Sequence, residues 1–234
     1  VEEIAQDLGL DKPVPQQFLI YAQDTLTLNF EDSFSFMGQD VKQVIYDHIW
    51  PTLLLVATST IAAAGIGLLI GTYGGWRQGS RFDVGSQVFT LFVYSMPEFW
   101  FGILVLMAFA GGIGPFPALF PAGGYSTPGA ELTGFAHVAD VLNHLALPWF
   151  VLTVTFIGAF ALIMRNSLIA VMNDQFVMTA RAKGVRDRQI LWRHVVPNAL
   201  LPTFTLVLLS LGFVFGGVIA IEFPSAYAQD ARSY

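Results

Sequence analysis

The chain has 234 residues and no Cys; 54% of the residues are hydrophobic, 12% are charged, and the formal net charge is −6. Ordinary soluble domains carry about 25% charged residues, so this composition excludes an ordinary soluble protein and predicts one that lives in a lipid bilayer. The lack of Cys excludes disulfides and Cys-based metal sites.

Residues 1–48 are expected to form an external segment, since they hold nine of the 17 acidic residues. Within this segment Glu2–Leu10 predicts a short helix, and Pro13 and Pro15 precede a second helical stretch over Gln16–Leu26. Long loops of this kind commonly cover the structure beneath them, so a cap over the outer mouth of the membrane helices is the favoured interpretation. A dedicated ligand site is the alternative.

Residues 49–234 are predicted to form the membrane domain, because four segments are apolar and long enough to cross a bilayer as helices. Bare strands cannot span the membrane, because their backbone groups would be unpaired in lipid. The predicted fold class is therefore all-α, a polytopic membrane protein. The predicted spans cover residues 51–76, 85–111, 145–164 and 199–221.

The positive charges indicate the orientation, because short cytoplasmic loops retain Lys and Arg. Eight of the eleven Lys and Arg residues lie within 77–83 and 165–194. We therefore expect these two loops to be cytoplasmic and residues 1–48 to be extracytoplasmic. A chain that begins outside the cell needs a preceding hydrophobic segment, so the sequence is expected to be a fragment. The missing segment is a cleaved signal or, as the favoured alternative, an uncleaved first span.

Five glycines fall at four-residue spacing within two of the predicted spans. This spacing suits the close approach of helices in a membrane, and helix packing is favoured over a role in substrate binding or gating. The glycines are Gly67, Gly71, Gly75, Gly212 and Gly216.

Glu98 is the one acidic residue deep inside a predicted span, and it follows Pro97. Carboxylates are costly in lipid, so an intramembrane Glu suggests a functional role. Glu98 and Pro97 are candidates for the lining of a translocation path. The favoured alternative is a structural one, in which Glu98 bonds locally near the carbonyl freed by Pro97 or pairs with another subunit.

His137, Asp140 and His144 have helical spacing on an external segment and could share one face as metal ligands. Three such residues near a surface are more often solvated or used in capping. We therefore expect no metal site.

The loop of residues 165–198 is the most informative part of the chain. Asn173 and Asp174 are good N-cap residues for a helix over Gln175–Lys183, and Gly184 suits its C-terminal end because glycine readily adopts a positive φ. Asp187 is expected to cap a second short helix. The pattern predicts a helix, a tight turn and another helix.

Pro197 and Pro202 are expected to mark a break before the last span. The loop also has apolar side chains among its basic ones, and these need a surface to pack against. The lipid headgroup region is one candidate, and a groove in a cytosolic protein is the favoured one. The apolar residues are Phe176, Val177, Ala180, Ala182, Val185, Ile190, Leu191 and Trp192.

This loop resembles that of the inner-membrane permease subunits of ABC importers, in the dipeptide, oligopeptide and nickel branch. That branch commonly reads T-A-R-A-K-G, then L-W-R-H, then N-A-L-L-P, and here the matching stretches are Thr179–Gly184, Leu191–His194 and Asn198–Pro202. The Glu that opens the family's general motif falls on Met178, and its Leu falls on Val196. The match is therefore to the peptide branch rather than to the broad consensus.

Further matches spread the resemblance over nearly the whole chain: Leu8–Pro13 with Gln17, Pro51–Leu53, Pro97–Trp100 with Gly102, and Arg165–Leu168. The opening Gly-Leu-Asp-Lys-Pro is similar to that of the first of the two permease subunits in such systems. Members typically have six spans, which implies that the first and last are missing here. After Glu222–Pro224 the family continues with a Pro-Gly-Leu-Gly-like turn that this chain lacks, so its C-terminus is expected to be truncated or divergent.

The resemblance implies a transport subunit with a second permease subunit, two cytosolic ATPase subunits and an extracytoplasmic solute-binding protein as partners, in a lipid bilayer. The chain has no Gly-x-x-x-x-Gly-Lys-[Ser/Thr] phosphate loop, so ATP hydrolysis is expected on a separate chain. No cofactor and no nucleic acid is expected. Peptides are the favoured substrates, and nickel, glutathione-like compounds and oligosaccharides are the alternatives.

The resemblance also assigns the ATPase-coupling role to the loop around Gly184. An ion-gradient-driven secondary transporter that uses Glu98 is the alternative, although inverted repeats and paired intramembrane charges are not seen. The coupling residues implied are Asp174, Phe176, Val177, Thr179, Ala180, Arg181, Ala182, Lys183, Gly184, Leu191, Arg193, His194 and Pro197.

Overall fold

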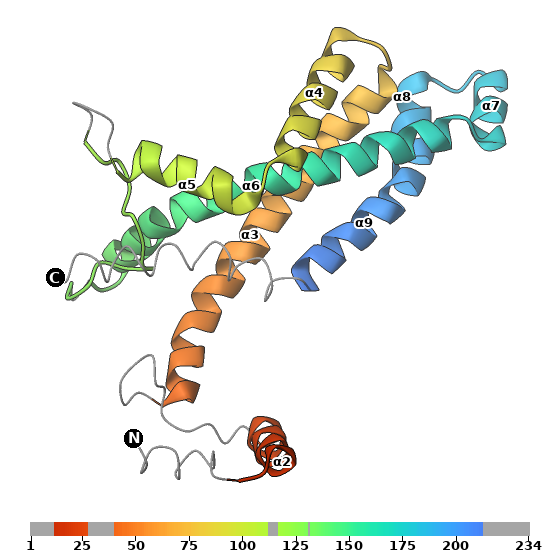
Figure 1. Cartoon of the computed structure of the whole chain (residues 1–234). Helices are drawn as coiled ribbons and strands as arrows, with labels where there is room; N and C mark the ends of the chain where they lie inside the picture. The colour runs from red at the N-terminus through yellow and green to blue at the C-terminus, as the bar shows by residue number, and fades with distance from the viewer. Residues whose placement is uncertain (1–11, 28–39, 112–116, 131, 213–234) are drawn as a thin grey trace. The chain divides into compact units, whose positions relative to one another are not determined.

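The computed structural model describes residues 12–27, 40–111, 117–130 and 132–212 (Figure 1). The chain divides into two compact units, Val1–Pro51 and Thr52–Tyr234. The described part of the first unit contains helix α2, Val14–Leu26, close to the predicted helical stretch. The predicted helix Glu2–Leu10 lies outside the described residues.

Helices α3 and α4 form a hairpin in the second unit (Figure 1). Helix α3, Val41–Trp76, begins in the first unit and continues into the second. Helix α4 is Arg81–Ser95, and Ser80 caps it because the Ser80 Oγ accepts a hydrogen bond from the Asp83 N–H at 3.2 Å. Gly79 allows the tight turn before this cap through its φ of +73°.

The predicted span over residues 85–111 is two helices rather than one. Helix α4 ends at Ser95, helix α5 is Glu98–Phe109, and the two are bent by 97°. Met96 has extended backbone angles, φ −80° and ψ 133°, because the ring of Pro97 disfavours the helical region for the residue before it. The pair is a broken span or a re-entrant loop.

Helix α6, Phe135–Met172, is the central element of the second unit and contacts α4, α5 and α9. The α3–α6 contact is close at Gly67, Gly71 and Gly75. A Cβ added to Gly71 would lie 2.8 Å from the Met164 Cβ, and at Gly75 it would lie 3.1 Å from the Arg165 backbone oxygen. These three glycines therefore allow the backbones of α3 and α6 to pack closely.

The two prolines of the last span do not break it as expected. Helix α9, Val196–Gly212, contains both Pro197 and Pro202. The irregularity lies one turn earlier, in the π-helical turn η1, Leu191–Val195, where the Val196 N–H donates to the Leu191 carbonyl. This wider turn precedes Pro197, whose ring cannot donate the usual hydrogen bond. Residues 213–221 of the predicted span, Gly216 among them, lie outside the described residues.

The fold class predicted from the sequence, all-α with several membrane spans, is confirmed. Within the part of the chain that the structure describes, three helices are long and apolar enough to cross a membrane, or four if α4 and α5 count as one span. The three are Val41–Trp76, Phe135–Met172 and Asp187–Gly212.

Candidate functional site

Helix α7, Gln175–Ala182, follows α6 and ends in a glycine-dependent turn. The Gly184 N–H donates to the Arg181 carbonyl at 2.9 Å, and the Val185 N–H donates to the Ala180 carbonyl at 3.2 Å. This pair of bonds is a Schellman motif, in which the residue after the C-cap takes the left-handed conformation. Gly184 does so with φ +76°. The turn reverses the chain at the position where the sequence predicted it.

A short helix, α8, follows the turn and spans Asp187–Ile190. Asp187 was expected at the N-cap, but Arg186 has that position and Asp187 is the first helical residue. A carboxylate in the first turn is still favourable, since it faces the positive end of the helix dipole. Its Oδ1 also lies 4.0 Å from the Arg181 Nε, across the turn from α7.

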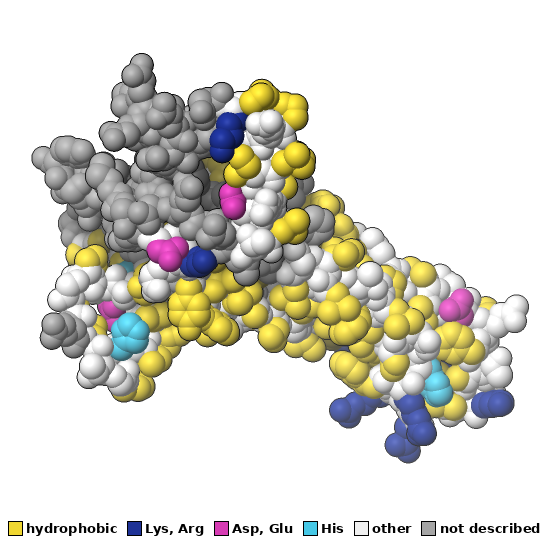
Figure 2. Space-filling model, turned by 90° about the horizontal axis from the view of Figure 1, so that it is seen from below, with side chains coloured by type: hydrophobic (Ala, Val, Ile, Leu, Met, Phe, Trp, Pro, Cys, Tyr) yellow, Lys and Arg dark blue, Asp and Glu magenta, His cyan; other side chains and the backbone are white. Residues whose placement is uncertain are grey.

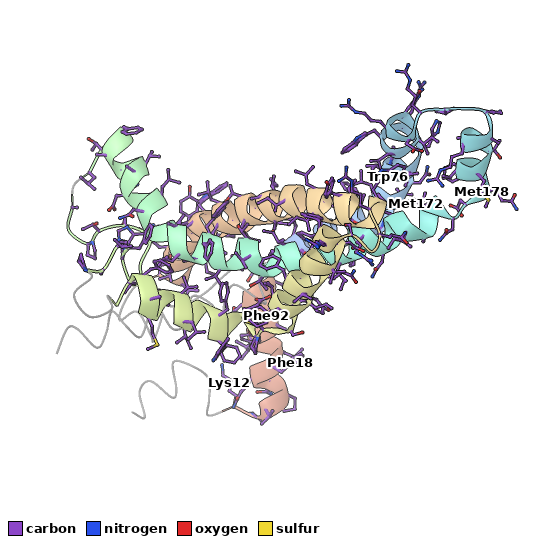
Figure 3. All side chains as sticks on the ribbon, turned by 90° about the horizontal axis from the view of Figure 1, so that it is seen from above. Lys12, Phe18, Trp76, Phe92, Met172 and Met178 are labelled. Atoms are coloured by element: carbon purple, nitrogen blue, oxygen red, sulfur yellow. The ribbon has the colours of Figure 1, made fainter. Side chains whose placement is uncertain are left out.

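One side of this helix-turn-helix packs on the end of the membrane helices. Val177 of α7 and Ile190 of α8 are fully buried, in one apolar cluster with Met164 and Leu168 of α6. Trp76 and Met172 lie at the edge of the cluster, and Figure 3 shows both near α7 and α8. The loop is therefore held as part of the second unit's core rather than as a mobile connection.

The other side of α7 is exposed. Phe176 is 41% exposed and Met178 is 67% exposed, and Lys and Arg side chains gather at this end of the unit (Figure 2). Of the predicted coupling residues, Val177 and Leu191 are buried, and Ala180 and His194 are half-buried. The exposed ones are Asp174, Phe176, Thr179, Arg181, Ala182, Lys183, Gly184, Arg193 and Pro197.

A buried ion pair, which the sequence does not predict, lies at the base of this loop. The Arg165 Nε donates to the Asp83 Oδ1 at 2.6 Å, and the Arg165 Nη2 donates to the Asp83 Oδ2 at 2.9 Å. The Gly79 N–H also donates to the Asp83 Oδ2, at 2.9 Å. The side chains of Asp83 and Arg165 are only 2% and 17% exposed. They are 82 residues apart, so no local pattern links them.

Pro97 and Glu98 lie at the bend between α4 and α5. Pro97 is the N-cap residue of α5 and Glu98 is its first helical residue, half-buried, so its carboxylate lies at the positive end of the helix dipole. Among the described residues no hydrogen bond or ion pair is found for the Glu98 side chain. The bend between α4 and α5 therefore places Glu98 where the helical span is interrupted.

The Asp140 carboxylate, at the start of α6, binds Thr127 in the preceding segment. It accepts hydrogen bonds from the Thr127 N–H at 2.7 Å and the Thr127 Oγ1 at 2.6 Å. The His144 Nδ1 lies 2.8 Å from the Asp140 backbone oxygen, and His137 is exposed. Within residues 12–27, 40–111, 117–130 and 132–212, no group of three His, Asp or Glu side chains is placed to hold a metal ion.

Comparison with known proteins points to one family of transport proteins. The profile of the family described as binding-protein-dependent transport system inner membrane component matches residues 64–229. The sequence is 33% identical to a peptide permease protein of Brucella suis biovar 1 over 222 residues, which is 95% of this chain and 67% of that protein.

Two further relatives carry names for peptide transport. The oligopeptide transport system permease protein AppB of Bacillus subtilis is 32% identical over 221 residues, 94% of this chain and 67% of that protein. The di/tripeptide transport system permease protein DppB of Pseudomonas aeruginosa is 30% identical over 230 residues, 94% of this chain and 68% of that protein. The chain thus spans about two thirds of the length of these relatives.

Proposed function

This chain belongs to the family of binding-protein-dependent transport system inner membrane components, and from this premise we propose that it is a permease subunit of an ATP-driven importer of peptides. It is a multi-pass protein of the inner membrane and a transport component rather than an enzyme. Its proposed partners are a second permease subunit, two cytosolic ATPase subunits and an extracytoplasmic solute-binding protein.

The observation that carries the proposal is the division of α7 into a buried and an exposed side. Val177 fixes the inner side in the apolar cluster, while Phe176 and Met178 remain open to a partner. Apolar groups on a helix surface bind well in a groove of another protein, where water is excluded. We propose that α7 and the Gly184 turn occupy such a groove in the ATPase.

The charges around the loop support a cytoplasmic position for this contact. Arg181, Lys183, Arg186, Arg188 and Arg193 are all exposed. An excess of Lys and Arg is typical of cytoplasmic loops, and this supports an ATPase contact on the side of the membrane where ATP is available. The basic residues would also attract an acidic rim on the partner and increase the rate of association.

Peptides are proposed as the substrate because the named relatives are peptide permeases. We further propose that the α4–α5 bend, with Pro97 and Glu98, lies along the translocation path. A half-buried carboxylate at a break in a membrane helix offers a polar group to a passing peptide amine, and intramembrane carboxylates commonly mark such paths.

Uptake into proteoliposomes tests the function. The complex is purified from its native membrane, reconstituted with its solute-binding protein outside, and loaded with ATP inside. We expect uptake of a labelled tripeptide mixture with internal ATP and none with an ion gradient alone. Uptake driven by the ion gradient without ATP would contradict the proposal and favour a secondary transporter that uses Glu98.

A further inference from the structure

The ion pair between Asp83 and Arg165 has the geometry of a fixed link between two helices. Two N–H groups of one guanidinium meet the two oxygens of one carboxylate, and this fork arrangement sets the relative orientation of the groups as well as their distance. The Asp83 carboxylate is held further by the Gly79 N–H, and its own N–H donates to the Ser80 Oγ. Neither end of the pair is free to reorient.

Arg165 lies at the base of the helix-turn-helix and is packed against the same cluster as the loop. Its neighbours Met164 and Leu168 belong to the cluster that buries Val177 and Ile190 of the loop. Helix α3 packs closely on the Arg165 backbone, since a Cβ added to Gly71 would lie 3.0 Å from the Arg165 nitrogen. A close-packed region of this kind shifts as one body rather than deforming.

Asp83 lies at the other end of the link, in the first turn of α4. Helix α4 leads directly into the 97° bend and α5. A second close contact keeps α4 on α6 two turns further along, where a Cβ added to Gly158 would lie 3.0 Å from the Thr90 backbone oxygen. The ion pair therefore connects the start of α4 to the base of the loop, and the Gly158 contact holds α4 against α6.

We propose that Asp83 and Arg165 are positioning residues that transmit displacement of the ATPase-binding loop to the bent span α4–α5. The inference rests on the proposed function, because it needs an ATPase that moves the loop. A buried ion pair adds little net stability compared with apolar side chains of the same size. The ion pair instead fixes the relative position of α4 and α6. Apolar surfaces can slide on one another, whereas a fork held by two hydrogen bonds cannot.

Distance measurement by pulsed electron paramagnetic resonance tests the link. The chain has no Cys, so spin labels attach only at introduced ones. Gln189→Cys labels α8 and Val88→Cys labels α4, and both positions are exposed. The labelled chain is assembled with its partners and measured without nucleotide and with ATP and vanadate. In the parent protein we expect the same label distance in both states, since loop and α4 move together.

Asp83→Asn should separate the two movements, so that the label distance shifts between the nucleotide states. Arg165→Lys keeps the charge and loses the fork, and should give a smaller shift. Arg81→Lys, at the exposed first residue of α4, is the matched control and should give none. Unchanged distances in Asp83→Asn, with the ATPase still bound, would overturn the inference and leave the proposed function intact. A parent complex that binds no ATPase would overturn both.

Discussion

The guanidinium of Arg165 on α6 meets the carboxylate of Asp83 on α4 at two points, 2.6 Å and 2.9 Å. Arg165 directly follows the predicted span 145–164, at the end proposed to be cytoplasmic, and Asp83 precedes the predicted span 85–111. The pair therefore joins the end of one span to the start of another. Both side chains are largely removed from solvent. The polar contact therefore lies inside the packed end of the helices, where each partner depends on the other for its neutralisation.

Removal of one partner should destabilise the protein more than removal of both. Asp83→Ala leaves the Arg165 charge without a counter-ion, and breaking a buried pair in this way costs about 3–5 kcal/mol. The double variant Asp83→Ala with Arg165→Leu should regain much of that loss. Thermal unfolding of the purified single and double variants in detergent measures the difference, and additive losses would show that the two residues do not interact.

Gly184→Val should abolish transport while the protein still inserts in the membrane. The native φ of +76° suits glycine, and left-handed backbone costs an L-residue about 1–2 kcal/mol, with the largest cost for a branched side chain. The turn after α7 would then lose its form. Gly184→Asn is the control, because Asn tolerates this conformation and should retain most activity. Transport rate and membrane content are measured together, and normal uptake by Gly184→Val would show that the turn is dispensable.

Gly71→Ala should destabilise the α3–α6 contact. The added Cβ would lie 2.8 Å from the Met164 Cβ, and overpacking of this kind typically costs about 1–3 kcal/mol. Gly65→Ala on the same helix meets nothing within 4 Å, and there Ala should be neutral or stabilising through its higher helix propensity. The midpoints of thermal unfolding compare the two variants. Equal effects at both positions would mean that close helix packing does not depend on Gly71.

Asp140→Ala should release the segment around Thr127 from α6. Two hydrogen bonds to the carboxylate hold that residue, one from its N–H and one from its Oγ1. Thr127→Val removes only the second bond and should have a smaller effect. Amide hydrogen exchange at Thr127 reports the change, and the rate should rise most in Asp140→Ala. Thr133→Val, an exposed position nearby, serves as the control, and an equal rise there would point to a general loosening of the segment.

Local features of the loop could be read from the sequence. A helix before Gly184 was predictable because glycine is the residue that best ends a helix with a left-handed turn. The structure places α7 at Gln175–Ala182, within a residue of the predicted range. The long apolar segments likewise predicted membrane helices, since a bilayer requires their length.

Features that depend on distant residues could not be read in this way. Asp83 is the last residue of the predicted loop 77–83, and only the packing of α4 on α6 gives it Arg165 as a partner. Pro97 indicated a freed carbonyl within one continuous span, whereas the structure has two helices bent by 97°. The π-helical turn before Pro197 was missed because a proline in the sequence indicates a disturbance without saying which residues absorb it.

The role of the exposed side of α7 is tested most directly by affinity copurification with Phe176→Ser. The protein is purified in detergent from its native membrane, and the ATPase that accompanies it is quantified against the parent protein. Gln189→Ser, at an exposed polar position of α8, is the matched control. We predict that the parent protein and Gln189→Ser retain the ATPase and a second permease, while Phe176→Ser keeps the permease and loses most of the ATPase. Equal recovery of the ATPase with Phe176→Ser would contradict the account.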